Sequence, residues 1–174
     1  MSFHGGAIGL TFSTFLYTKK YKINFLNALD LISIVVPIGL FFGRIANFVN
    51  AELYGRATDM PWAVIFPTGG NFGRHPSQIY EAILEGIVLF LIMLLAYKKL
   101  NYKKQPGKIA AIFLIFYSAF RFIVEFFREP DLHIGFIFEY MTLGQILSLV
   151  SFIIAIACYY RFSNIALVKK ARWW

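Results

Sequence analysis

Three charged side chains lie close together within an apolar stretch of the chain, RFIVEFFREPD. Arg121, Glu125 and Arg128 are separated by four and three residues, so a helix would present all three on one face. A charge inside a bilayer costs several kcal/mol and is kept mainly where it faces a cavity or a partner. One carboxylate cannot neutralise two guanidiniums, and the planar guanidinium suits phosphate. The pattern therefore favours an anion site, and an internal salt bridge near the membrane surface is the alternative.

A second polar cluster lies in GRIANFVNAELYGR, residues 43–56. Arg44, Asn47 and Asn50 recur every three residues, so a helix would align them on one face. Asparagine amides can orient a glycerol or phosphate oxygen, and Arg44 can supply positive charge. We interpret the cluster as a phosphate or glycerol site; a capped helix end followed by a polar loop is the alternative. After this cluster, we expect a turn at Gly55 and an ion pair between Glu52 and Arg56.

Two shorter motifs, HPSQIYE and SFHGG, carry the other polar residues of interest. Ser77 is placed to cap a following helix, whose first turn would hold Gln78, Tyr80 and Glu81. A carboxylate at position 81 would complement the start of that helix. His4 could serve as a general base, because the ordinary pKa of histidine is about 6.5. The three histidines lack zinc-ligand spacing, so no metal is expected.

The elements that must position these residues are long apolar segments. Of the 174 residues, 59% are hydrophobic and 15% charged, whereas about a quarter of a soluble domain is charged. A run of about 18 or more apolar residues can cross a bilayer as a helix. Four runs come near or above that length, and a fifth, 5–17, is short. The four long runs are 25–43, 79–97, 109–127 and 141–160.

We therefore expect an all-α, polytopic integral membrane protein with about five transmembrane helices. Residues 1–174 would form a single membrane domain, and residues 44–78 would be an outward-facing loop or arm region within it.

The net charge of +8 is concentrated in three segments that alternate with the apolar runs. Segments 19–22, 98–108 and 161–172 hold three, five and four basic residues and no acidic residue. If the runs alternate across the membrane, all three segments face the cytoplasm by the positive-inside rule. The N-terminus and the polar motifs would then face outward and the C-terminus inward. Basic charge is thus explained by topology, and no nucleic-acid partner is expected.

Together, the four motifs resemble those of the phosphatidylglycerol–prolipoprotein diacylglyceryl transferase family in order and separation. The resemblance extends over nearly the whole chain. It implies an enzyme of the bacterial inner membrane that transfers the diacylglyceryl group from phosphatidylglycerol to the lipobox cysteine thiol of a preprolipoprotein, the first step of lipoprotein maturation. The implied partners are phosphatidylglycerol, the lipobox peptide and membrane lipid, and no cofactor is implied.

The resemblance also implies roles for individual positions. Catalytic positions of the family fall on His4, Arg121 and Glu125. Positions that bind phosphatidylglycerol fall on Arg44, Asn47, Gly55 and Arg121. Supporting positions are Asn50, Glu52, Arg56, Gln78, Tyr80, Glu81 and Arg128.

These roles give a mechanistic hypothesis. Arg44 and Arg121 would hold the lipid phosphate, and Glu125 would fix the orientation of Arg121. The substrate thiolate would attack the glycerol carbon and displace the phosphate, whose growing negative charge the guanidiniums would stabilise. His4 is the base expected to deprotonate the thiol, and Glu125 is the alternative base.

The chain departs from the family pattern in two ways. Ala46 stands where the GRxGN core of the family usually has its glycine. The chain also begins where a later span of the family would begin, so the N-terminal spans and the functional tyrosine they carry are expected to be missing. A truncated, inactive remnant of the family is therefore one alternative. An anion- or lipid-binding or transport membrane protein is another, because the same arginines could line an anion path.

Overall fold

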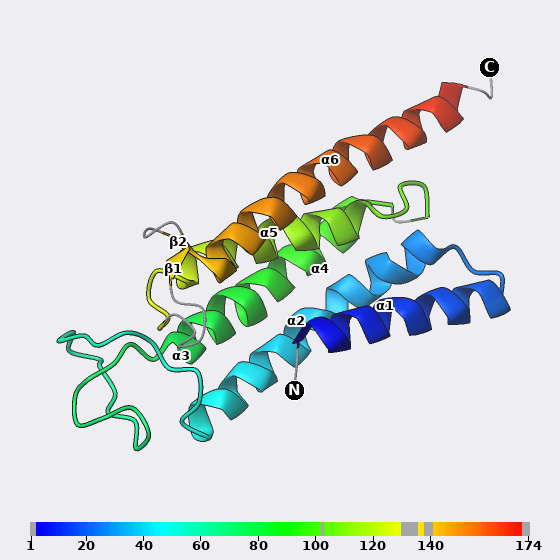
Figure 1. Cartoon of the computed structure of the whole chain (residues 1–174). Helices are drawn as coiled ribbons and strands as arrows, with labels where there is room; N and C mark the ends of the chain where they lie inside the picture. Colours follow the sequence, from blue (N-terminus) through cyan, green and yellow to red (C-terminus); the bar gives the residue numbers. More distant parts are fainter. Residues whose placement is uncertain (1–2, 102, 130–135, 138–140, 172–174) are drawn as a thin grey trace.

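The computed structural model describes residues 3–101, 103–129, 136–137 and 141–171, and it is mostly helical (Figure 1). A two-residue strand pair, antiparallel, is the only sheet among these described residues. The expectation of an all-α membrane protein is confirmed. The elements in chain order are α1 (Phe3–Lys20), α2 (Phe25–Val49), α3 (Ser77–Glu81), the π-helix η1 (Ala82–Val88), α4 (Leu89–Lys99), α5 (Lys108–Val124), β1 (Phe136–Ile137), β2 (Met141–Thr142) and α6 (Leu143–Ala171).

Three helical stretches in the described part of the chain are long and apolar enough to cross a membrane: Phe25–Val49, Ser77–Lys99 and Leu143–Ser163. α1 and α5, with 18 and 17 residues, do not meet the same measure of length and composition. Many large apolar side chains are exposed along the helices, as expected for surfaces that face lipid. The molecule is thus a membrane protein.

The central span, Ser77–Lys99, changes its helical form part-way along. It begins as α3, widens into η1 and continues as α4 without a break. Gly86 lies in the widened part, where an added Cβ would come within 2.7 Å of the Cβ of Phe41 in α2. The glycine therefore permits close approach of the two helices. Single π-helical turns within α-helices are frequent at functional sites.

A buried carboxylate joins α2 to the start of α5. Asp30 has no exposed surface, and its two oxygens accept hydrogen bonds from the backbone N–H groups of Gly107 and Ala110, each at 2.8 Å. Gly107 has a φ of +86°, which a glycine adopts without strain. The first N–H groups of a helix have no partner within the helix, and an anion there is also favoured by the helix dipole. Asp30 thus fixes the position of α5 against α2.

The segment between α2 and α3, residues 50–76, is folded around one arginine. The expected loop region 44–78 therefore includes the last turn of α2 and the first residues of α3. Arg74 is buried, and its Nε and Nη1 donate to the carbonyl oxygens of Gly69 and Gly55 at 2.8 and 3.1 Å. Its guanidinium also pairs with Glu129 and lies 4.7 Å from the ring centre of Tyr54. These contacts attach the loop to the end of the helical bundle.

The connections of the bundle divide between its two ends (Figure 1). The α1–α2 connection, the α4–α5 connection and the C-terminal end of α6 lie at one end. The 50–76 segment and the β1–β2 pair lie at the other. The lysine-rich segments of the sequence are thereby separated from the polar motifs, as the charge pattern predicted.

Candidate functional site

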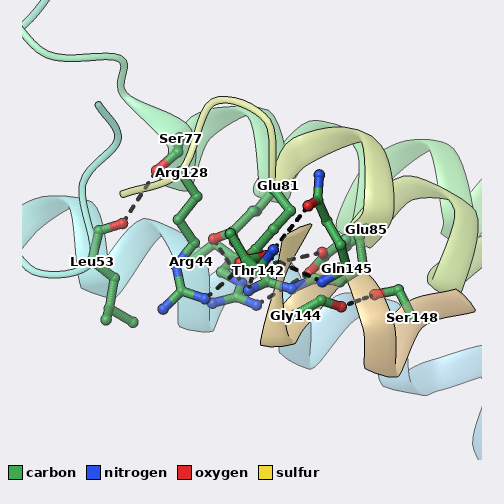
Figure 2. Close-up of polar contacts among 12 residues, drawn as sticks. Arg44, Leu53, Ser77, Glu81, Glu85, Arg128, Thr142, Gly144, Gln145 and Ser148 are labelled. Carbon is green, nitrogen blue, oxygen red and sulfur yellow. Dashed lines mark hydrogen bonds and ion pairs between the residues drawn. The ribbon is translucent and has the colours of Figure 1, made fainter. Parts of the chain in front are cut away.

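Three helical stretches contribute charged side chains to one network near the end of the bundle that carries the 50–76 segment. Figure 2 shows Arg44 of α2 directed toward Glu81 and Glu85 of the central span. The Nε of Arg44 lies 3.2 Å from Oε2 of Glu81, and its Nη2 donates to Oε2 of Glu85 at 3.2 Å. Two nitrogens of this guanidinium thus face different carboxylates, which limits the orientations open to Arg44.

The network continues through α5. Arg121 pairs with Glu81 through Nη1, and the same nitrogen lies 4.0 Å from Oε1 of Glu85. Its Nη2 lies 2.9 Å from Oε2 of Glu125, one turn along the same helix. Arg128 approaches that same carboxylate oxygen at 3.9 Å. The three late-motif charges therefore lie together, but not on one helical face, because α5 ends at Val124 and Arg128 lies beyond it in a bridge with Gly55.

The balance of charge differs from what the sequence led us to expect. The anion site was inferred from two arginines that share one carboxylate, Glu125. That premise does not hold, because Glu81 and Glu85 also face Arg121 from the central span, and the anion site itself stays a prediction. The network contains three arginines and three glutamates and has no net charge. An excess of positive charge is therefore not the feature that would attract a phosphate.

The carboxylates and the arginines of the network form two layers that differ in solvent exposure. The side chains of Glu81, Glu85 and Glu125 are 0%, 0% and 5% exposed. Those of the arginines are more accessible: 17% for Arg44, 13% for Arg121 and 14% for Arg128. The carboxylates are thus the most deeply buried members of the network, and the arginine side chains keep its accessible surface. An anion that reaches the network would contact an arginine side chain before a carboxylate.

The third carboxylate is held by residues at the start of α6. The hydroxyl of Thr142 donates to Oε1 of Glu125 at 2.9 Å. The backbone N–H of Thr142 donates to Oε1 of Gln145. In return, the backbone N–H of Gln145 donates to the hydroxyl oxygen of Thr142 at 3.2 Å. An added Cβ at Gly144 would lie 2.6 Å from Oε1 of Glu125. Glu125 therefore sits against backbone that only glycine allows to come so close.

The predicted base lies in α1, and its role stays a prediction. The backbone of His4 is in the first turn of that helix. The orientation of its side chain is outside what the structure describes.

The other predicted positions near the end of α2 lie in different surroundings. Asn47 is half-buried, one turn beyond Arg44 on the same helix, whereas Asn50 is the exposed C-terminal cap of α2. Glu52 is exposed, and its carbonyl oxygen accepts a hydrogen bond from Nε2 of Gln78 at 2.7 Å. Asn47 thus lies one turn from Arg44 along α2. The side chain of Gln78 holds the loop that follows α2 through its hydrogen bond to Glu52.

Gly55 and Arg56 lie where the loop meets the end of α5. The N–H of Gly55 donates to the carbonyl of His75 at 2.9 Å, and an added Cβ would come within 2.6 Å of that same oxygen. The expected pair between Glu52 and Arg56 is absent from the ion pairs of the described residues. Arg56 turns the other way, and its Nε donates to the carbonyl oxygen of Arg128 at 2.9 Å.

The HPSQIYE motif packs the loop onto the bundle. The hydroxyl of Tyr80 accepts a hydrogen bond from Nε1 of Trp62 at 2.7 Å and lies 3.2 Å from Nδ1 of His75. Ser77 does not cap the helix as expected, since the hydroxyl donates to the carbonyl of Leu53 at 3.2 Å. Glu81, expected at the start of this helix, also has a further role, because its carboxylate is fully buried between two arginines.

Comparison with known proteins identifies the family of the chain. The model of the family described as Prolipoprotein diacylglyceryl transferase matches residues 1–161. The chain belongs to the prolipoprotein diacylglyceryl transferase family. Proteins named phosphatidylglycerol–prolipoprotein diacylglyceryl transferase are 57% identical over 149 residues in Rickettsia bellii (strain OSU 85-389) and 55% identical over 148 residues in Rickettsia typhi (strain ATCC VR-144 / Wilmington). These matches cover 86% and 85% of this chain, and the chain spans 57% of the length of each relative.

Some members of the network in this member of the family were missed by sequence reasoning. Glu85 is a charge within an apolar span, four residues after Glu81, so the rule that singled out Glu125 would also have found it. Thr142 and Gln145 carry no such signal, because neutral polar residues are common near helix starts. Among the described residues, no set of histidine, cysteine and carboxylate side chains is arranged to hold a metal ion.

Proposed function

We propose that this chain transfers the diacylglyceryl group of phosphatidylglycerol to the cysteine thiol of a prolipoprotein, the activity named for its relatives. The sulfur of the thiolate forms a bond to the glycerol carbon, and the bond from that carbon to the phosphate oxygen breaks. Glycerol phosphate leaves with the electron pair, and the thiol proton passes to a base of the protein. The products are a thioether-linked lipid and glycerol 1-phosphate.

The layered network is the observation that carries this proposal. A guanidinium has five N–H donors, and the ion pairs of Arg44 and Arg121 with the glutamates involve two nitrogens of each arginine. Both side chains keep some accessible surface, and we propose that a lipid phosphate accepts hydrogen bonds from them there. Because the buried carboxylates hold the arginines in place, the donors are ready to stabilise the charge that develops on the leaving phosphate.

The assignment of the base follows from the partners of Glu125. The carboxylate of Glu125 lies beside Arg121 and Thr142, an arrangement that suits orientation of the arginine better than proton transfer. We therefore assign proton removal to His4 and positioning of Arg121 to Glu125. Asn47, next to Arg44 along α2, would bind a hydroxyl or phosphate oxygen of the glycerol headgroup.

We also propose five membrane crossings, with the network on the outward side of the bacterial inner membrane. α5 has 17 residues and so a length of about 25 Å, near the thickness of the hydrocarbon core. The lysine-rich segments lie at the opposite end of the bundle from the network (Figure 1), which supports a cytoplasmic location for that end. The lipid headgroup and the lipobox peptide would then meet at the outer surface.

The proposal is tested with this 174-residue chain reconstituted in vesicles that contain phosphatidylglycerol with labelled acyl chains. Transfer of label to a lipobox peptide is followed with time. We expect Arg44→Ala and Arg121→Ala each to lower the rate at least about a hundredfold, the loss typical for one donor to a developing oxyanion. Arg161→Ala, which removes an exposed arginine of α6 at the basic end, is the matched control and should keep the wild-type rate.

Two outcomes would contradict the proposal. A wild-type transfer rate in Arg44→Ala would show that Arg44 does not bind the phosphate. A wild-type chain that inserts into the vesicles, with a relative active under the same conditions, and yet transfers no label would show that this chain does not have the activity.

A further inference from the structure

A groove of about 800 Å³ lies at the basic end of the molecule, away from the charged network. Tyr17 of α1 and Ile23, Ala28 and Leu31 of the α1–α2 connection and α2 are among its lining residues, and Lys103 of the α4–α5 connection lies at its edge. Its volume falls within the range of small-molecule and cofactor sites. The groove is separate from the proposed transfer site in both residues and position.

The wall of the groove is apolar even where the lining residues carry hydroxyls. Ser13 and Thr14 both donate to the carbonyl oxygen of Leu10 within their own helix, at 3.0 and 2.7 Å. Their hydroxyl groups are therefore directed to backbone. The exposed side chains of Tyr17, Ile23 and Leu31, which are about half accessible, supply apolar surface. Such a wall suits an acyl chain.

Two polar groups at the groove indicate the other part of its ligand. The Oδ1 atom of Asn27 is buried without a hydrogen-bond partner, an unfavourable state for an amide unless a ligand supplies one. The amide can bind a hydroxyl or, after rotation, an ester carbonyl. Lys103 adds positive charge, and further lysines lie at the same end: Lys19 and Lys20 in the last turn of α1, Lys22 in the α1–α2 connection and Lys104 in the α4–α5 connection.

We propose that this groove binds an anionic glycerophospholipid of the leaflet at the basic end. An acyl chain lies along Ala28 and Leu31, the glycerol ester region meets the amide of Asn27, and the phosphate meets Lys103. Charge complementarity selects the anionic headgroup, since basic residues next to a membrane attract anionic lipid. The site does not depend on the proposed transfer reaction.

The test measures binding of phosphatidylglycerol and phosphatidylcholine with identical acyl chains to the detergent-purified full chain by native mass spectrometry. Lys103→Gln and Lys104→Gln remove the same charge from the same connection, and only Lys103 is among the residues that line the groove. We expect Lys103→Gln to weaken phosphatidylglycerol binding about fivefold relative to Lys104→Gln. Phosphatidylcholine binding should be equal in the two variants.

A second pair of variants tests the apolar part. Ala28→Phe fills the groove and should lower binding of both lipids, whereas Val35→Phe enlarges an exposed side chain farther along α2 and should not. The same losses are expected in an Arg44→Ala background, which separates this site from the transfer site. Equal phosphatidylglycerol affinity in Lys103→Gln and Lys104→Gln would overturn the proposal. Equal lipid binding by Ala28→Phe and Val35→Phe would also overturn it and leave a polypeptide segment or a second copy as occupant.

Discussion

Glu85 illustrates at the residue scale how the network depends on charges that water does not reach. Its carboxylate is fully buried, with Nη2 of Arg44 at 3.2 Å and Nη1 of Arg121 at 4.0 Å. Burial of an ion costs free energy that close, well-oriented partners must offset, and removal of one partner leaves the other uncompensated. The glutamates therefore hold the arginines in position, as the arginines would hold a bound phosphate.

Glu85→Gln tests this dependence, because it keeps the size of the side chain and removes its charge. Arg44 then loses one of its two carboxylates, and its guanidinium is held less firmly. We expect kcat for transfer to fall about tenfold to a hundredfold, the cost of a misplaced group, while KM for phosphatidylglycerol does not rise. The control is Asp59→Asn in the exposed part of the loop. An unchanged kcat in Glu85→Gln would separate Glu85 from the function of Arg44.

Gly144 tests the position of the third carboxylate. In Gly144→Ala, the new methyl group would lie 2.6 Å from Oε1 of Glu125, so the carboxylate must move and Arg121 loses one of its carboxylate partners. Such overpacking typically costs about 1–3 kcal/mol. Transfer by Gly144→Ala should therefore be strongly reduced. Gly39→Ala is matched to it, because an added Cβ there meets nothing within 4 Å, and equal rates in the two variants would refute the role of Gly144.

At the scale of elements, Asp30 shows how α5 is placed. Asp30→Ala would leave the N–H groups of Gly107 and Ala110 without their acceptor. We expect the free energy of unfolding to fall by about 2 kcal/mol, the upper range for loss of a helix cap. Thermal unfolding of the chain in detergent measures the effect, with Asp59→Ala as the exposed control. A melting temperature equal to that of the wild type would contradict this role.

The sequence predicted the elements better than the contacts between them. The apolar runs predicted where helices lie, and the spacing of Arg121, Glu125 and Arg128 predicted that they lie together, although α5 ends before Arg128. The pair of Arg44 with Glu85 could not be inferred in this way, because the two lie 41 residues apart and only folding decides which helices meet. Gly86, in the π-helical part, approaches α2 closely, and no local pattern predicts such a contact.

The whole molecule is polarised, with basic connections at one end and the charged network at the other. The proposed topology can be tested in a Cys158→Ser background, since Cys158 is the single cysteine of the chain. A membrane-impermeant maleimide should label Asp59→Cys in intact spheroplasts. It should label Lys104→Cys only after permeabilisation. The reverse pattern would invert the proposed orientation, and labelling of both sites from outside would contradict the positive-inside assignment.

The central claim is that the arginines of the network hold the phosphate of phosphatidylglycerol. The most direct measurement is photo-crosslinking with phosphatidylglycerol that carries a diazirine on its headgroup glycerol, followed by mapping of the labelled peptides. We predict label on the peptide that contains Arg44 and Asn47, lost when Arg44 and Arg121 are both replaced by alanine and retained in Lys103→Gln. Label that is absent from this peptide in the wild type, or that persists there after both replacements, would contradict the claim.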